Sequence, residues 1–325
     1  MRILIPSPCY EDSFADNVRD TLVDMGHEVR TLGEIQFHKY WSRHRLLARL
    51  LVGRLSGTKP TPEDYKVLRI AREFKPDLIL STTTTLHPLI LDELGVVSSR
   101  RRALWWGDSA ANNRRWGLLD PSWDAVFVKD RAAAQKLELL GRNVHLLYEA
   151  MNPKWHKPVA ERRNGAVVVV GNYYAFRQAI IVRLIEDGVV MKLYGSNPPV
   201  WAHPKISEIH TGRYVVREEK SRIFGEGAAI LNTFDFSDCD ALNCRAFEVA
   251  GAGGLQLIEY RPAIEECFVP GQELLVFKSY EELIELIRRV EKYPAEMESI
   301  RRAGAGRALA EHTYRHRLEV ILDKF

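Results

Sequence analysis

Short apolar runs separated by amphipathic stretches recur along the first half of the chain, and this alternation predicts strands and helices in turn. The expected strands are Ile3–Ile5, His27–Thr31, Leu78–Ser81, Ala103–Trp106, Ala125–Val128 and Val144–Leu147. The expected helices are one carrying Phe14, Val18 and Leu22 on a single face, Glu63–Phe74, one near Pro88–Leu94, and Ala132–Leu140. Short apolar strands separated by helices imply a parallel sheet that is covered on both faces.

The same alternation begins again after a linker between Met151 and Asn164 that contains Pro153 and Pro158. The strands expected here are Val167–Val170, Val189–Tyr194, Ala228–Thr233, Leu255–Ile258 and Leu274–Phe277. The helices expected here are Arg177–Asp187, one starting near Asn243, Tyr280–Lys292, Glu296–Glu311 and a last one from Thr313. The predicted fold class is therefore α/β, with two Rossmann-like doubly wound domains facing a cleft.

Length and composition agree with two ordinary globular domains. A chain of 325 residues, 46% hydrophobic and 27% charged, is too long for one core and fits two domains of roughly 150 residues. The four cysteines show no paired C-x-x-C spacing, so the pattern supports neither a disulfide framework nor zinc. A net charge of +3 is too small to indicate nucleic acid. The first residues are expected to form a strand, not a signal peptide, and no run reaches the ~20 apolar residues of a membrane span, so a cytoplasmic protein is expected.

The segment from Asp240 to Ile258 carries the strongest chemical signal. A helix beginning near Asn243 follows a strand, and such a helix start favours a phosphate through its free N–H groups and dipole. Arg245 and Glu248 are three apart and share one helix face, which offers a cation for a diphosphate and a carboxylate for ribose hydroxyls. The alternative is a capped helix ended by glycines.

A second candidate is the loop Gly171–Arg177, which follows the first strand of the second half. Gly171 allows a ligand to approach the backbone, and Arg177 at the next helix start suits a phosphate oxygen. Asn172 and Tyr173 belong to the same candidate loop, and Gly195 follows the next strand in the same way. The loop lacks the G-x-G-x-x-G fingerprint of dinucleotide enzymes, and a plain strand–glycine–helix turn is the alternative.

Asp240 stands eight positions before Glu248, so one acid could reach the donor sugar while the other reaches the ribose. A solvated turn is the alternative for Asp240. Asp238, Cys239 and Asp240 form a D-x-D, a pattern that in another architecture would hold Mn²⁺ or Mg²⁺, but its late place in the chain argues against a metal here.

In the first half, candidate acceptor residues stand at two strand ends. Asp108 follows the run L-W-W-G and could orient or deprotonate an acceptor hydroxyl, or cap the segment beginning at Ala110. His87 follows four threonines and is a second candidate for acceptor contact, with a structural role as its alternative. Residues 38–55 form a basic helical pattern that could lie on anionic lipid at the inner membrane face, or else pack its leucines on the domain.

Several motifs together resemble the GT-B glycosyltransferases, and within them the family named after the spore maturation protein CgeB. They are Gly171–Arg177 with the later L-Y-G, N-C-R-A-F-E-V-A-G-A-G-G (Asn243–Gly254), P-G-Q-E-L-L-V-F (Pro270–Phe277), H-T-Y-R-H-R (His312–Arg317), W-W-G-D-S and Y-E-A-M-N-P (Tyr148–Pro153). The likeness covers most of the second half and is patchy in the first.

The resemblance implies an acceptor-side domain over residues 1–155, a nucleotide-sugar domain over 156–311, and a last helix over 312–325 that returns to the first domain. It implies a metal-independent sugar transfer from a nucleoside-diphosphate-sugar with no further cofactor. In this reading Glu248 binds ribose, while Arg245 and Arg177 bind the diphosphate. Asp240 replaces the first Glu of the E-x7-E pattern of many retaining GT-B enzymes, which leaves its catalytic role and the stereochemistry open.

Three other interpretations remain open from the residues alone. They are a nucleotide-sugar-binding protein without transferase activity, a sugar-nucleotide epimerase of the same architecture, and a metal-dependent transferase that uses Asp238 and Asp240. The base, the sugar and the acceptor cannot be read from the chain.

Overall fold

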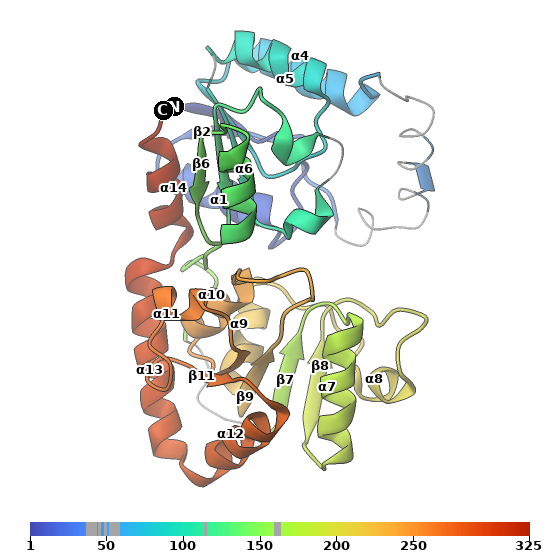
Figure 1. The fold of residues 1–325 in the computed structure, drawn as a ribbon, viewed down its shortest axis with the longest axis vertical. Helices are drawn as coiled ribbons and strands as arrows, with labels where there is room; N and C mark the ends of the chain where they lie inside the picture. Colours follow the sequence, from blue (N-terminus) through green and yellow to red (C-terminus); the bar gives the residue numbers. More distant parts are fainter. Residues whose placement is uncertain are drawn as a thin grey trace. The chain divides into compact units, whose positions relative to one another are not determined.

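The computed structural model describes residues 1–36, 59–99, 101–113, 116–158 and 164–325, together with His44, Leu47, Ala48 and Leu51. The chain divides into two compact units, unit 1 with Met1–Tyr148 and Tyr314–Phe325, and unit 2 with Glu149–Thr313. Each unit is built on one parallel sheet (Figure 1).

The sheet of unit 1 has six strands in the order β2-β1-β3-β4-β5-β6. The strands are β1 (Arg2–Leu4), β2 (Glu28–Arg30), β3 (Leu78–Ser81), β4 (Arg102–Trp106), β5 (Ala125–Val128) and β6 (Val144–Leu146). The helices are α1 (Phe14–Asp24), α4 (Pro62–Phe74), α5 (Pro88–Val97), α6 (Arg131–Leu139) and α14 (Tyr314–Leu322). Strands β3 and β5 are buried along their whole length, which is why they read as continuous apolar runs.

The sheet of unit 2 has five strands in the order β11-β10-β9-β7-β8. The strands are β7 (Val167–Val170), β8 (Met191–Tyr194), β9 (Ala229–Asn232), β10 (Gln256–Glu259) and β11 (Leu275–Phe277). The helices are α7 (Ala175–Glu186), α8 (Pro204–Ile209), α9 (Arg217–Glu226), α10 (Cys244–Gly251), α11 (Ala263–Cys267), α12 (Tyr280–Lys292) and α13 (Pro294–Glu311). With β7 counted as the first strand of this unit, the order read from β8 to β11 is 2-1-3-4-5, a doubly wound order.

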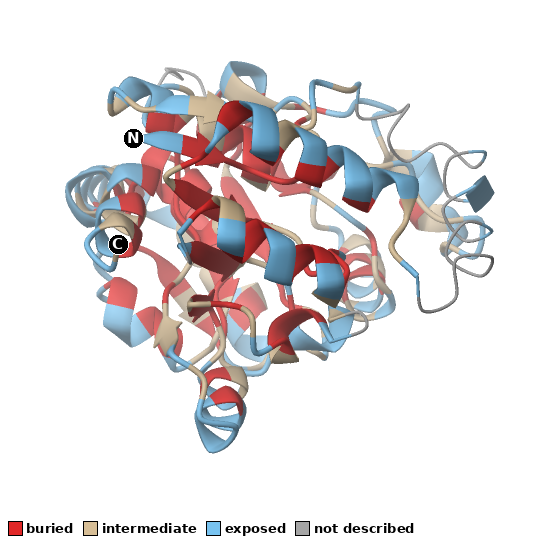
Figure 2. Cartoon of the chain, turned by 90° about the horizontal axis from the view of Figure 1, so that it is seen from above, coloured by how far each residue is buried: buried red, intermediate tan, exposed pale blue. Residues whose placement is uncertain are grey.

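The cores lie between sheet and helices, as Figure 2 shows by the buried residues along the strands and on one side of the flanking helices. In unit 1, Phe14 of α1, Trp105 of β4 and Tyr314 of α14 form an aromatic cluster with ring centroids 4.8–6.0 Å apart. Helix α14 therefore packs beside α1, although 165 residues of unit 2 (Glu149–Thr313) separate it from the rest of unit 1.

The predicted fold class and all eleven predicted strands are confirmed, with ends that differ by one or two residues. Three helices of unit 2 were not predicted, namely α8, α9 and α11. Helices α8 and α11 span only six and five residues. Helix α9 begins R-E-E-K and has no side-chain cap hydrogen bond, so its sequence carries a weak helical signal.

Candidate functional site

The candidate site of unit 2 lies where the strand order reverses, between the carboxyl ends of β7 and β9. Open α/β sheets bind ligands at this switch point, because the loops on either side run in opposite directions and leave a crevice. The loop after β7 begins at Gly171, and Thr233 directly follows β9. The predicted donor-binding residues Gly171 and Arg177 therefore stand at this point of the fold.

Two glycines let the loops after β7 and β8 lie backbone against backbone. Gly195 has a φ of +115°, and a Cβ built on it would stand 2.5 Å from the carbonyl oxygen of Gly171. Gly171 has a φ of +137°, and a Cβ there would stand 2.3 Å from a guanidinium nitrogen of Arg245. The backbone angle favours glycine at both positions, and at Gly195 the space does so as well, because its Cβ would meet backbone atoms.

Arg177 lies beneath this loop and is only 2% exposed. Its Nε donates to the Thr233 hydroxyl at 3.0 Å, and its Nη2 donates to the Thr233 carbonyl at 2.7 Å. The same guanidinium donates to the carbonyl of Asn172 at 2.6 Å and to the hydroxyl of Tyr174 at 2.8 Å. Arg177 thus ties the loop after β7 to the end of β9.

Arg245 approaches Gly171 from the first turn of α10 and is half-buried. Its Nη1 donates to Oδ1 of Asn232 at 3.1 Å. Neither Arg245 nor Arg177 pairs with a carboxylate among the residues that the structure describes. Burial, and then the nearby charge of Arg245, lower the pKa of Arg177 to about 10. Two like charges held together at the edge of a glycine loop make a site that favours an anion.

A network of amides under the start of α10 fixes the orientation of Arg245. Asn232 is fully buried and exchanges hydrogen bonds of 3.0–3.1 Å with Asn243. Asn232 also donates to Oε1 of Gln256 at 2.9 Å, and Gln256 donates to the Ala246 carbonyl at 3.1 Å. Buried polar networks whose members are satisfied are rigid, so Arg245 rests on a defined support.

The amino end of α10 is already partly capped by the protein. Asn243 is its N-cap, and the amide oxygen accepts from the N–H of Ala246 at 3.2 Å. The carboxylate of Glu149 accepts from the N–H of Cys244 at 3.0 Å. The helix dipole still points at this end, but two of its free N–H groups have partners, so the two arginines become the main attraction for an anion.

Glu248 lies one turn further along α10 and is only 5% exposed. Its Oε1 accepts from Nζ of Lys220 on α9 at 2.8 Å, and Nε2 of His156 lies 3.7 Å from the same oxygen. Lys220 did not figure among the predicted site residues, because α9 was not predicted and a single lysine in R-E-E-K reads as a solvated charge.

The remaining predicted residues of unit 2 have mainly local contacts. Tyr173 is buried, its hydroxyl donates to the Tyr194 carbonyl at 2.7 Å, and burial raises its pKa well above the usual range. The side chain of Asn172 is exposed. Asp240 is half-buried, and its Oδ1 accepts from the N–H of Ala263 at 3.2 Å, at the start of α11.

In unit 1, Asp108 and His87 also have local partners. Asp108 is exposed, and its carboxylate accepts from the N–H of Ser109 at 2.8 Å and from the side-chain amide of Asn112 at 3.0 Å. Ser109, not Asp108, caps the short 3-10 helix at Ala110–Asn112. His87 is the N-cap of α5, and its Nδ1 accepts from the N–H of Leu89 at 3.2 Å.

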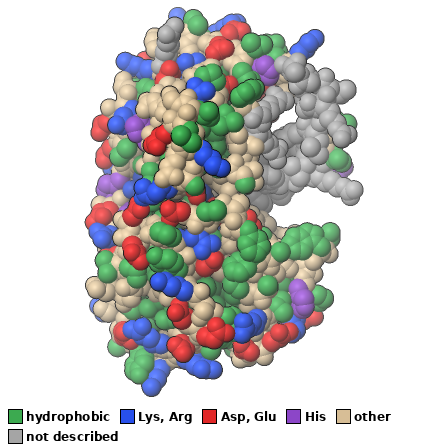
Figure 3. All heavy atoms as spheres, in the orientation of Figure 1, with side chains coloured by type: hydrophobic (Ala, Val, Ile, Leu, Met, Phe, Trp, Pro, Cys, Tyr) green, Lys and Arg blue, Asp and Glu red, His purple; other side chains and the backbone are tan. Residues whose placement is uncertain are grey.

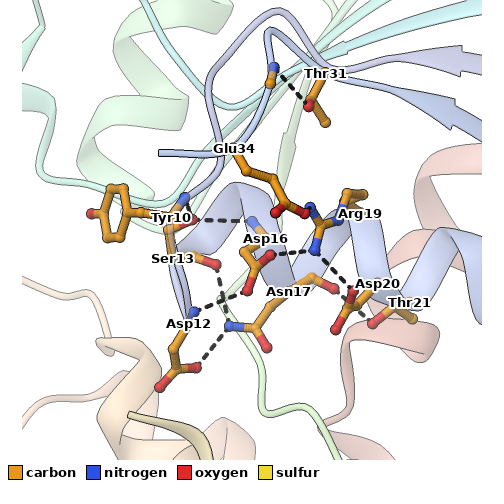
Figure 4. Close-up of polar contacts among 11 residues, drawn as sticks. Tyr10, Asp12, Ser13, Asp16, Asn17, Arg19, Asp20, Thr21, Thr31 and Glu34 are labelled. Carbon is orange, nitrogen blue, oxygen red and sulfur yellow. Dashed lines mark hydrogen bonds and ion pairs between the residues drawn. The ribbon is translucent and has the colours of Figure 1, made fainter. Parts of the chain in front are cut away.

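The loop after β1 holds an acidic residue that the sequence analysis passed over (Figure 4). Asp12 has a φ of +62°, an uncommon angle for a residue other than glycine. Its Oδ1 accepts from the Asn17 amide at 3.0 Å, and its N–H donates to Asp16 at 2.9 Å. Asp16 in turn pairs with Arg19 at 2.6 Å, so this turn is held by a chain of polar contacts.

The segment 38–55, for which the sequence left open a membrane surface or packing on the domain, lies outside the described residues apart from His44, Leu47, Ala48 and Leu51. Within the described part of the chain, no helix combines the length and apolarity that a membrane crossing requires. On the face drawn in Figure 3, acidic and basic side chains are interspersed over both units, without a large patch of one sign.

The fold and this site define the class of protein: a glycosyltransferase of the GT-B type, with two doubly wound units and a candidate anion site at the switch point of the second. The sequence profile of the Glycosyl transferase-like family matches residues 155–323, and the chain belongs to that family. A comparison with the curated protein sequences finds no match.

Solved structures share the fold at low sequence identity. Sucrose-phosphate synthase from Thermosynechococcus elongatus has a TM-score of 0.66 and 13% identity, and the match covers 99% of this chain and 96% of that one. HepE of Anabaena, in complex with UDP and glucose, has a TM-score of 0.67 and 12% identity, with 100% of both chains covered. The lipopolysaccharide outer core galactosyltransferase WaaB, in its apo form, has a TM-score of 0.58 and 12% identity, with 100% and 99% covered.

Proposed function

We propose that this glycosyltransferase moves a sugar from a nucleoside-diphosphate-sugar to an acceptor hydroxyl without a metal ion or other cofactor. The observation that carries the proposal is the convergence of Arg245 and Arg177 on Gly171, with no carboxylate partner among the described residues. A diphosphate placed there would relieve the repulsion between the two guanidinium groups.

In this proposal Arg245 contacts the diphosphate directly, because it is the more exposed of the two arginines. Arg177 adds positive charge from below Gly171 and keeps the loop in place through Thr233. As the bond between the sugar C1 and the phosphate oxygen breaks, negative charge grows on the leaving diphosphate. Fixed cations at that point lower the barrier, because they need no reorganisation during the reaction.

Glu248 would bind the ribose hydroxyls, since it lies one turn after Arg245 on the same helix. Asp240 would contact the transferred sugar from the turn before α10. In unit 1, Asp108 and His87 would contact the acceptor, with Asp108 as the candidate to take the proton of the attacking hydroxyl. The new bond joins the acceptor oxygen to C1, and the nucleoside diphosphate leaves with the charge.

The neighbours support a nucleotide-sugar donor, since structures of HepE are described in complex with UDP and with UDP-glucose. Within the family, the motifs Gly171–Arg177 and Asn243–Gly254 favour a CgeB-like enzyme. A cytoplasmic location stays a prediction from the sequence, and peripheral membrane contact through residues 38–55 stays one of its two alternatives for that segment.

The test is a thermal-shift panel of nucleoside diphosphates and their sugars, followed by an assay for release of the nucleotide. A ligand that binds only the folded chain raises its melting temperature in proportion to the logarithm of its concentration over Kd. Binding followed by acceptor-dependent release supports the transferase. Binding without any release would indicate a sugar-nucleotide-binding protein, and formation of an isomeric sugar nucleotide without acceptor would indicate an epimerase.

A further inference from the structure

A buried ion pair joins Lys220 of α9 to Glu248 of α10, and the proposed function gives no role to Lys220. The Lys220 side chain is 10% exposed and the Glu248 side chain 7%, and their nitrogen and oxygen are 2.8 Å apart. Lys220 lies on the inner face of α9 with Ile223 and Phe224, at a position where a helix normally carries an apolar residue. Its presence there needs a reason.

Stability does not supply that reason. Removing two charges from water costs about as much as their attraction returns, and well-packed apolar residues in such places are often neutral or stabilising. Pairs of this kind on the surface of unit 2, such as Lys205 with Glu186 at 2.7 Å, incur no such cost because water solvates both partners. The burial of Lys220 is better explained by its effect on Glu248, a residue of the candidate site.

The surroundings of Glu248 explain why it needs a cation. The Cys244 thiol has its pKa raised by desolvation and then by the charges of Glu248 and Glu149, so two carboxylates stand near the start of α10. Burial of a carboxylate without a cationic partner favours loss of its charge. Lys220 supplies that partner and donates to Oε1. The second oxygen, Oε2, accepts no hydrogen bond from the described part of the chain, so it stays available to a ligand.

His156 lies near the same oxygen. The histidine is 1% exposed, and its Nδ1 accepts from the N–H of Asn152 at 3.2 Å, which places the ring proton on Nε2. That nitrogen lies 3.7 Å from Oε1 of Glu248. Oε1 is therefore held by the ammonium group of Lys220, and the imidazole of His156 lies close to the same oxygen without a hydrogen bond to it.

We infer that Lys220 is a positioning residue that holds the Glu248 carboxylate in a buried ion pair and in one orientation, and so sets the preference of the site for a ribose over a deoxyribose. An ionised carboxylate accepts hydrogen bonds from vicinal hydroxyls, whereas a carboxylic acid must spend one oxygen as a donor. The inference rests on the proposed function, because it takes Glu248 as the group that meets the sugar of the nucleotide.

The experiment measures Kd by calorimetry for ADP, GDP, CDP and UDP and for the 2′-deoxy form of each. For the best-bound base, the wild-type chain should prefer the ribo form by at least about tenfold, as expected for a hydrogen bond to a charged group. K220M should reduce this ratio to within about threefold, and E248Q should do the same. The double variant should show no further reduction of the ratio, since the two residues act as one unit. K220R should keep most of the preference.

The control is K205M, which removes a lysine of a comparable but exposed ion pair and should leave the ratio unchanged. If Lys220 had a merely structural role, its replacement would weaken the binding of the ribo and deoxyribo forms equally. An unchanged ratio in K220M therefore overturns the inference. K220Q provides the same readout if K220M does not fold. If the wild-type chain binds none of the eight nucleotides, the proposed function itself is wrong. If the wild-type chain prefers a deoxyribo form, only the role of Lys220 and Glu248 is overturned.

Discussion

The carboxyl edges of the two sheets differ in how their charged side chains are satisfied. At the edge of unit 1, Asp12 and Asp108 have donors close by in sequence, from Asn17, Ser109 and Asn112. At the edge of unit 2, Arg177 and Arg245 converge without a carboxylate in the described chain, and burial and like charge lower the pKa of Arg177.

This difference indicates which ligand each edge suits. An edge whose acids already have neutral donors suits a neutral ligand rich in hydroxyl groups, such as an acceptor. An edge where two cations have no carboxylate partner in the described chain stores unfavourable repulsion that an anion relieves, as a nucleoside diphosphate would.

Replacing Arg245 by alanine should reduce turnover by about 10²–10³-fold, the range found when one fixed transition-state donor is removed. The nucleotide-induced rise in melting temperature should shrink as well. The melting temperature of the free protein should not fall, because the repulsion on Arg177 is removed. R183A is the control, since Arg183 forms an exposed ion pair with Glu281 at 3.4 Å. Wild-type turnover in R245A would refute the assignment of the anion site.

Replacing Asp108 by asparagine should reduce acceptor-dependent turnover by about a hundredfold, the lower end of what a general base contributes. Binding of the nucleotide should stay unchanged, because the residue belongs to unit 1. D92N is a suitable control, since Asp92 is exposed and accepts from the Ser122 hydroxyl at 2.6 Å. Loss of nucleotide affinity in D108N would contradict the division of labour between the units.

Replacing Gly171 by alanine should weaken nucleotide binding by about tenfold, equivalent to roughly 1.4 kcal/mol. The new Cβ would meet the Arg245 guanidinium, which must then move away from the loop. G188A is the matched control, since Gly188 also has a positive φ, of +82°, but a Cβ there meets nothing within 4 Å. G188A should therefore lose stability through backbone strain while its nucleotide affinity stays at the wild-type value.

Removal of divalent cations with EDTA should have the smallest effect and leave turnover unchanged. In the proposed function the two arginines carry the charge that a metal supplies in enzymes that use a D-x-D pattern. The measurement is turnover before and after chelation, with added Mg²⁺ and Mn²⁺ as the reverse test. Loss of activity that Mn²⁺ restores would favour the metal-dependent alternative with Asp238 and Asp240.

The sequence predicted the architecture well because its signals are local. Apolar runs such as Val167–Val170 are typical of buried strands of a parallel sheet, and the break at residues 151–164 separates two such series. The sequence also placed Gly171, Arg177 and Arg245 at strand and helix ends. The helix α9 was missed, and Lys220 with it, because charged residues at its start obscure the apolar face that Ile223 and Phe224 define.

The sequence by itself therefore determined the two α/β units and the residue types at the carboxyl edge of each sheet, since periodicity and glycine position act over a few neighbours. Only the tertiary structure decided which of these residues meet. Arg177 and Arg245 are 68 positions apart and come together on Gly171 because β7 and β9 are neighbours in the sheet. Lys220 meets Glu248 because α9 packs on α10. Pairings of this kind depend on strand order and helix packing, which no local pattern encodes.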